Sequence, residues 1–180
     1  MADIALVVIA VDGLWRRVGH IPAADRLEIR LAAEEGILFA LQTAGEEPPL
    51  QELRLMLRLD PVLIYGPGHR TEHNGRVLLT AASDCDQVLA CLAAEFSRDP
   101  LPFAPQHILA IGGAAADLPL LRAAGVTAWV AGEEPAPLAV DLVPGPVDLG
   151  VPGTAQAVTE LVRRNNRYLR PPTGRGRPRW

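Results

Sequence analysis

The chain has 180 residues, of which 49% are hydrophobic and 21% charged, and its formal net charge is −4. This length and composition favour one soluble globular domain with a sizeable core. No apolar run reaches the roughly 18 residues that cross a bilayer, and the first apolar stretch lacks the basic flank of a signal peptide. We therefore expect a cytoplasmic protein with no membrane segment. Cys85 and Cys91 should be reduced, because their spacing matches no metal or redox motif.

Charge is distributed unevenly along the chain. Seven arginines and no acidic residue lie from Arg163 onward, whereas the preceding part holds ten arginines and twenty-one acidic residues. The balance is therefore −11 in the body and +7 at the end. We expect a core domain at residues 1–164 and a disordered tail at 165–180, rich in Arg, Pro and Gly. The chain contains no lysine.

The apolar run IALVVIAVDG, residues 4–13, ends abruptly in Asp12 and Gly13. A short run rich in Val and Ile is typical of a strand buried on both faces of a parallel sheet. Open α/β sheets place their ligand crevice at the carboxyl ends of such strands. Asp12 is therefore the first candidate functional residue.

Strands and helices alternate along the rest of the chain. A loop at 14–23 is expected to lead into a helix that starts near Asp25 and ends at Gly36. Further strands are predicted at 37–42, 62–65, 108–111 and 126–130, and further helices at 50–59, 84–96, 118–124 and 155–164. Asn74-Gly75 predicts a hairpin with a primed turn near 66–80. The alternation predicts an α/β fold with a central, mostly parallel sheet and right-handed crossovers.

Several segments resemble motifs of the haloacid dehalogenase (HAD) phosphatases. VVIAVDGL is similar to their first motif, D-x-D-G-T-L at a strand end, and ILFALQTAGE to the Thr-bearing second motif of the Cof-type sugar phosphatases. ILAIGGAAADLPLLRAAGV resembles the fourth motif, G-D-G-x-N-D-x-P-M-L followed by A-G-V. The similarity extends in order over about residues 4–163. It implies a three-layer, Rossmann-like HAD fold.

The resemblance also implies a role for each motif position. The first Asp of D-x-D attacks phosphorus as a carboxylate nucleophile, and Ala10 stands in its place. The second Asp is the general acid and base, and Asp12 retains it. The second-motif Thr holds a phosphate oxygen, and Thr43 retains it. Taking Asp12 as the nucleophile instead would make Leu14 the general acid, which a leucine cannot be.

The resemblance also implies a lysine and a set of metal-binding acids, and most of these residues are absent. The third-motif Lys has no counterpart in a chain without lysine, and Arg98 is the nearest arginine before the fourth motif. Mg²⁺ prefers carboxylate oxygens, but Gly113 stands at the first acidic position of the fourth motif and only Asp117 is left. No cofactor is therefore expected, and Mg²⁺ is expected only if the protein is an active phosphatase.

These losses favour a non-catalytic pseudophosphatase that acts as a scaffold or regulatory protein through protein contacts. The alternatives are a Mg-dependent phosphomonoester hydrolase with weak or unorthodox activity, and a sensor of a phosphorylated ligand that uses Thr43. Asp12 and Asp117 also have a structural interpretation, since carboxylates at strand ends accept hydrogen bonds from loop N–H groups.

The segment 75–84 leaves no room for the cap domain that Cof-type enzymes insert. Capless relatives such as the KDO-8-phosphate phosphatases often use neighbouring subunits as the cap. The resemblance therefore implies a homo-oligomer, a dimer or a tetramer.

Three segments have features of other binding motifs. His69 and His73 have the spacing of a helical zinc pair, but the flanking Gly and Pro residues favour a hairpin loop. The GGAAAD segment lacks the spacing of a dinucleotide-binding loop. The tail motif RGRPR resembles an AT-hook, which lies in the DNA minor groove. Docking of the tail to a protein partner, or no binding at all, is the simpler interpretation.

Overall fold

The computed structural model describes residues 3–15, 20–45, 48–66, 70–82, 84–97, 103–130 and 153–162. The predicted tail at 165–180, together with His69 and Arg98, lies outside the described residues.

The described residues form one seven-stranded sheet in the order β5-β4-β3-β2-β1-β6-β7. The strands are β1 (Leu6–Ala10), β2 (Leu38–Thr43), β3 (Val62–Tyr65), β4 (Arg70–His73), β5 (Arg76–Leu79), β6 (Ile108–Gly112) and β7 (Val126–Trp129). The pairings among β3, β2, β1, β6 and β7 are parallel, whereas β4 pairs antiparallel with both β3 and β5 at one edge. The predicted mostly parallel sheet with a small hairpin insertion is confirmed.

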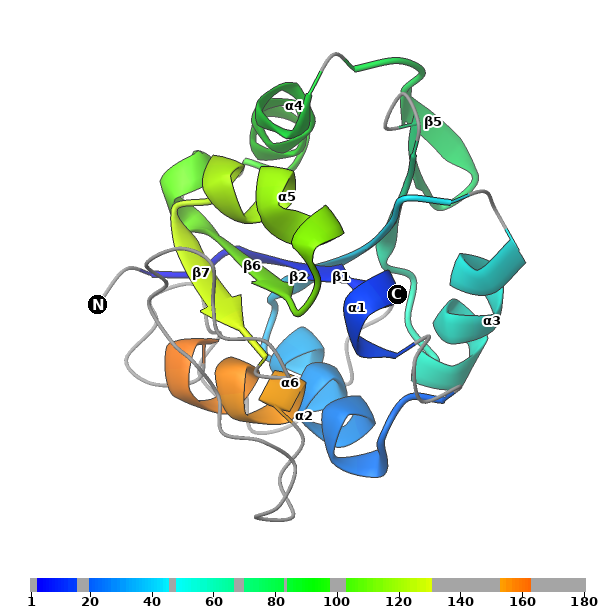
Figure 1. Cartoon of the computed structure of the whole chain (residues 1–180), viewed down its shortest axis with the longest axis vertical. Helices are drawn as coiled ribbons and strands as arrows, with labels where there is room; N and C mark the ends of the chain where they lie inside the picture. The colour runs from blue at the N-terminus through cyan, green and yellow to red at the C-terminus, as the bar shows by residue number, and fades with distance from the viewer. Residues whose placement is uncertain are drawn as a thin grey trace, which may run out of the picture.

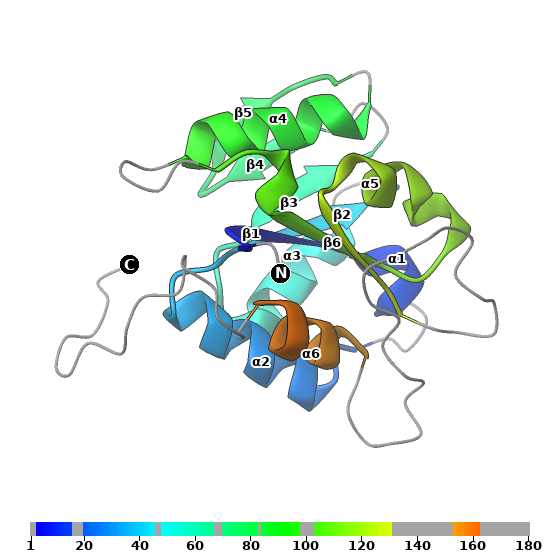
Figure 2. The same cartoon turned by 90° about the vertical axis from the view of Figure 1, so that its left-hand side faces the viewer.

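Helices cover both faces of the sheet and make a three-layer structure (Figures 1 and 2). One face packs against α2 (Ala23–Glu34), α3 (Pro48–Leu57), α6 (Gly153–Ala157) and a π-helical segment (Val158–Val162). The other face packs against α4 (Cys85–Phe96) and α5 (Leu118–Ala123). Both faces of β1 are buried, which explains why its sequence is apolar throughout rather than alternating.

Local signals fix the carboxyl end of α2, the start of α4 and the hairpin turn where the sequence predicts them. Gly36 follows α2 with φ of 102°, a backbone conformation that glycine adopts at little cost. The Asp84 carboxylate accepts a hydrogen bond of 3.0 Å from the Gln87 N–H and caps α4. Asn74 and Gly75 have φ of 51° and 74°, as a type I′ turn requires. Between β3 and α4 the described residues hold only this hairpin, so no cap domain is inserted there.

The predicted loop at 14–23 is wrong at both ends. A helical turn, α1 (Val11–Leu14), follows β1 directly, and α2 already begins at Ala23. Asp12 therefore lies on a helical turn just beyond the strand rather than on the strand itself.

The strand order places the sheet's switch point at β1. Two crossovers lead from β1 through β2 to β3 on one side, and β6 and β7 lie on the other. The carboxyl ends of β1, β2 and β6 thus meet at the crevice where α/β folds bind ligands. Within the described ranges, no helix has the length and apolarity needed to cross a bilayer.

Candidate functional site

The residues singled out from the sequence come together at the carboxyl edge of the sheet. Ala10 ends β1, Thr43 ends β2 and Gly112 ends β6, so their loops are adjacent. Asp12 follows β1 on α1, and a short 3₁₀ turn (Ala115–Asp117) follows β6. The structure therefore brings the residues singled out from the sequence together at one end of the sheet.

Asp12 and Thr43 are hydrogen-bonded to each other. The Thr43 hydroxyl Oγ1 lies 3.0 Å from both carboxylate oxygens of Asp12, and the Ala44 N–H donates to Asp12 Oδ2 at 2.7 Å. The Gly45 N–H donates in turn to Thr43 Oγ1 at 3.1 Å. A hydroxyl has one proton to donate. Because Thr43 donates that proton to Asp12, it has none left for a phosphate oxygen in this arrangement.

Asp117 is buried and holds its own loop. Its Oδ2 atom accepts hydrogen bonds of 2.9 Å from the N–H groups of Gly113 and Ala114, and the residue is 3% exposed. Burial raises the pKa of this carboxyl, the two backbone N–H groups act in the opposite direction, and the negative charge of Asp12 raises it further. The two carboxyl groups are thus close enough to interact electrostatically.

The position that the resemblance assigns to the nucleophile is apolar and enclosed. Ala10 is 1% exposed and belongs to the core cluster beneath α4 and α5, with Val8 and Ala110. Its methyl group has neither a lone pair nor an acidic proton, so it cannot form a covalent phosphoryl intermediate.

The position assigned to the first metal-binding acid is filled from the opposite loop. A Cβ atom built on Gly113 would lie 2.9 Å from Leu14 Cδ2 and 3.2 Å from the Val130 carbonyl oxygen. A Cβ on Gly13 would lie 2.8 Å from both Ala114 Cβ and Asp117 Oδ2. The loops after β1 and β6 are therefore in direct contact, and Leu14 occupies space that a side chain at 113 would need.

These residues do not fit a magnesium ion. Mg²⁺ needs an octahedral set of oxygen ligands. Gly113 offers no side chain, and Asp117 is buried with Oδ2 already accepting two N–H groups. Across the described ranges, no group of three or more His, Cys, Asp or Glu side chains is placed to hold a metal ion.

The weaker sequence candidates do not join the site. His73 ends strand β4 rather than lying on a helix, and His69 lies outside the described residues. The His73 Nε2 atom instead bonds the Asp60 carbonyl oxygen at 3.1 Å. Cys85 and Cys91 are free thiols on α4, and burial is the main cause that raises the pKa of each.

A buried carboxylate behind the site was missed from the sequence. Asp25 is 2% exposed; its Oδ2 accepts a 3.0 Å hydrogen bond from the Trp15 indole N–H, and its Oδ1 accepts one of 2.8 Å from the Ala155 N–H. It thereby ties the residue after α1 to the start of α6. A signal was present, because Asp25 shares the buried face of α2 with Ile29 and Ala32 at helical spacing.

Comparison with solved structures defines the class of fold as that of the HAD-like hydrolases. The cobalt-bound deoxy-D-mannose-octulosonate 8-phosphate phosphatase of Haemophilus influenzae superposes with a TM-score of 0.59 and 18% identity, over 88% of this chain and 86% of that one. A HAD-like hydrolase from B. subtilis gives a TM-score of 0.66 and 13% identity, over 88% and 100%. A superfamily phosphatase from Bacteroides thetaiotaomicron gives 0.63 and 15%, over 87% and 94%.

At these identities the likeness establishes the fold, and the chain has the HAD-like fold that its motifs predict. No family model matches the sequence, and no curated protein matches it either.

Proposed function

We propose that this HAD-like domain does not catalyse phosphoryl transfer and acts as a scaffold or regulatory protein through protein contacts. One observation carries the proposal: each polar side chain retained from the phosphatase motifs is hydrogen-bonded to the domain itself. Asp12 accepts from Thr43 and Ala44, and Asp117 accepts from Gly113 and Ala114. These bonds lock the loops after β1, β2 and β6.

The apolar replacements support the same conclusion. Ala10 extends the core to the carboxyl edge, and Leu14 closes the space beside Gly113. A carboxylate in either place would sit against apolar groups of the described residues, which is unfavourable unless a cation pairs with it. The structure therefore stabilises a crevice that is apolar at the positions where a phosphatase needs charge.

Apolar side chains on the helices offer a surface for protein contact. Leu27 on α2 is 56% exposed, and Leu55 and Met56 on α3 are 76% and 40% exposed. The two helices cover the same face of the sheet and are in contact (Figure 1). Burying such side chains in an interface would release ordered water and favour association. A homo-oligomer or a complex with another protein would bury these side chains.

The test is phosphate release by the purified full chain from a panel of phosphomonoesters, with Mg²⁺ and with EDTA. The matched control is Asp12→Asn, which keeps the volume of the side chain but removes its charge. We expect no turnover above the buffer blank for either protein. Mg-dependent turnover by the unmodified chain that is lost in Asp12→Asn would overturn the proposal and establish the hydrolase alternative.

A phosphate sensor would give a different result. A ligand that binds only the folded state raises its melting temperature. We expect no rise with sugar phosphates or inorganic phosphate at millimolar concentration, because the Thr43 proton is already donated to Asp12. A rise that disappears in Thr43→Val would support the sensor instead.

A further inference from the structure

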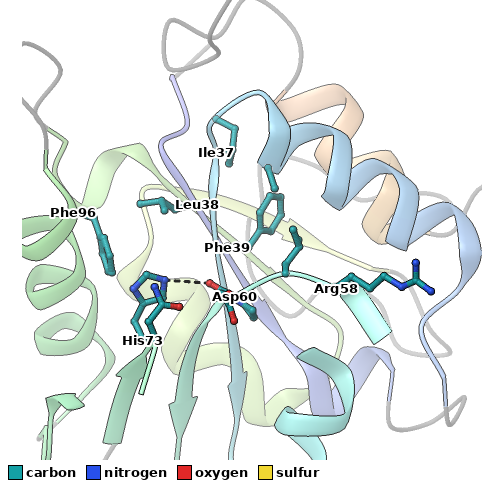
Figure 3. A pocket seen from close by; sticks show the side chains of 11 residues that line it. Ile37, Leu38, Phe39, Arg58, Asp60, His73 and Phe96 are labelled. Atoms are coloured by element: carbon teal, nitrogen blue, oxygen red, sulfur yellow. Dashed lines mark hydrogen bonds between the residues drawn. The ribbon is translucent and has the colours of Figure 1, made fainter. Parts of the chain in front are cut away.

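A cavity of about 390 Å³ lies at the opposite edge of the sheet from the candidate site (Figure 3). It is lined by the first residues of β2, the segment between α3 and β3, the end of β4 and the end of α4. Its volume is within the range of small-molecule sites, which are mostly apolar with a few polar groups. Neither the phosphatase motifs nor the proposed function accounts for it.

Aromatic rings form much of its wall. Phe39 and Phe96 line the cavity, and the His73 ring meets Phe96 edge-on, with centroids 5.1 Å apart and an interplanar angle of 85°. The hydrogen bond from His73 Nε2 to the Asp60 carbonyl oxygen holds the ring in place (Figure 3). The faces of aromatic rings carry negative electrostatic potential and attract cations.

Three helices end at this cavity. Ala33 lies in the last turn of α2, Arg58 and Leu59 follow the last residue of α3, and Phe96 is the last residue of α4. The carboxyl end of a helix carries a partial negative charge of about half an electron, felt within its last turn. Three such ends therefore each contribute a partial negative charge beside the cavity.

The formal charges around the cavity do not cancel these partial charges. The Asp60 carboxylate is paired with Arg54, so the two nearly neutralise each other. The guanidinium of Arg58 is exposed and points away from Asp60 and His73 (Figure 3). The helix ends and the rings therefore act on the inside of the cavity, whereas the Arg58 charge is directed outward.

We propose that this cavity binds a small protonated amine carried on an apolar body, such as an arylalkyl ammonium ion. The ammonium group is attracted by the helix carboxyl ends and the ring faces, and the apolar body packs against side chains such as Ile37, Leu59 and Pro61. A carboxylate or phosphate ligand is disfavoured by the same field.

The experiment uses three probes of similar size, phenethylammonium, 2-phenylethanol and phenylacetate. Each is titrated into the ¹⁵N-labelled full chain while backbone amide shifts are followed. We expect phenethylammonium to shift amides around residues 33–39, 58–61 and 73–74, with an affinity about tenfold above that of phenylacetate. Equal or tighter binding of phenylacetate or 2-phenylethanol, or no saturable shifts there with phenethylammonium, would overturn the proposal.

Two variants locate the site and its chemistry. Ala33→Leu fills the cavity and is expected to abolish binding, whereas Ala23→Leu, exposed at the other end of α2, should leave it unchanged. Phe96→Leu keeps an apolar wall but removes the ring. It should therefore weaken the binding of phenethylammonium several-fold and change the binding of 2-phenylethanol little. Phe103→Leu, at a phenylalanine that does not line the cavity, is the matched control. Melting curves of both variants verify that they fold. Equal losses for the charged and neutral probes in Phe96→Leu would contradict a cation site.

Discussion

Leu14 and Gly113, on two different loops, share one space at the carboxyl edge of the sheet. The Cδ2 atom of Leu14 lies 2.9 Å from the point that a Cβ atom on Gly113 would occupy. In the phosphatase motifs that this chain resembles, these positions hold a threonine and a metal-binding acid. In this chain the side chain at position 14 and the absence of one at position 113 are therefore coupled through the space that they share.

This coupling predicts a non-additive pair of substitutions. Gly113→Ala should lower the free energy of unfolding by about 1 kcal/mol, because its new methyl group crowds Leu14. In a Leu14→Ala background the same substitution should cost less, since the crowding atom is gone. Urea unfolding of the four proteins gives the interaction energy directly. Costs that simply add would show that Leu14 does not limit the space beside Gly113.

Asp117 should tolerate neutralisation, which a metal-binding acid would not. Both backbone N–H groups that it binds donate to Oδ2, so an asparagine can place its single carbonyl oxygen there. Because burial and Asp12 raise the pKa of Asp117, the charged form of this carboxyl is less favourable in the folded protein than in the unfolded chain. We expect Asp117→Asn to be neutral or stabilising at pH 7, measured by thermal and urea unfolding.

The pH dependence of that effect has a definite sign. A carboxyl whose folded pKa is raised contributes stability that is fully present below the ordinary value of 3.8 and is lost as pH rises through the folded pKa. The stability of Asp117→Asn relative to the unmodified chain should therefore increase as the pH is raised from 4 to 7. A relative stability that falls over this range would mean that the two N–H groups outweigh burial and lower the pKa of Asp117 instead.

Asp25 should respond in the opposite way to the same substitution. Its two oxygens each accept a different N–H, from Trp15 and from Ala155. An asparagine can satisfy only one of them, and its NH₂ group would face the other donor. Asp25→Asn should cost about 1–3 kcal/mol, whereas exposed Asp86→Asn should cost little. A cost no larger than that of the control would refute the role assigned to this buried bridge.

Arg58 adopts a backbone conformation that favours glycine. It follows α3 with φ of 54°, and its N–H bonds the carbonyl oxygens of Arg54 and Leu55. Arg58→Gly should raise the free energy of unfolding by about 1 kcal/mol, because glycine lacks the Cβ that makes this conformation unfavourable. Arg58→Ala retains the Cβ and serves as the control in chemical denaturation. An equal gain in the free energy of unfolding in both variants would show that loss of the arginine side chain, rather than relief of the backbone conformation, is the cause.

The fold could be predicted because its signals are local. Apolar runs such as residues 4–10 define central strands, Gly36 ends α2, and Asn74-Gly75 specifies the hairpin turn. The start of α1 was missed because a strand followed at once by a single helical turn has no periodicity to detect. The end of α3 at Arg58 could not be predicted either, because glycine or asparagine usually occupies this helix-ending conformation and arginine gives no such signal.

The site could be predicted only in part. The motifs placed Asp12, Thr43 and Asp117 at one edge, where the topology brings strand ends together. They could not show that Thr43 donates to Asp12, because that depends on side-chain geometry across two loops. The contact between Leu14 and Gly113 and the cavity at the amino edge arise from tertiary packing, which no single segment encodes.

The central claim is that this crevice forms no phosphoryl-enzyme. The most direct measurement is intact-mass spectrometry of the full chain after incubation with acetyl phosphate and Mg²⁺ and an acid quench. The account predicts an unmodified mass, because the methyl group of Ala10 cannot attack phosphorus and Asp12 is held by Thr43 and Ala44. A stoichiometric phosphoryl adduct that peptide mapping places on Asp12 would contradict it and make Asp12 the nucleophile of an active enzyme.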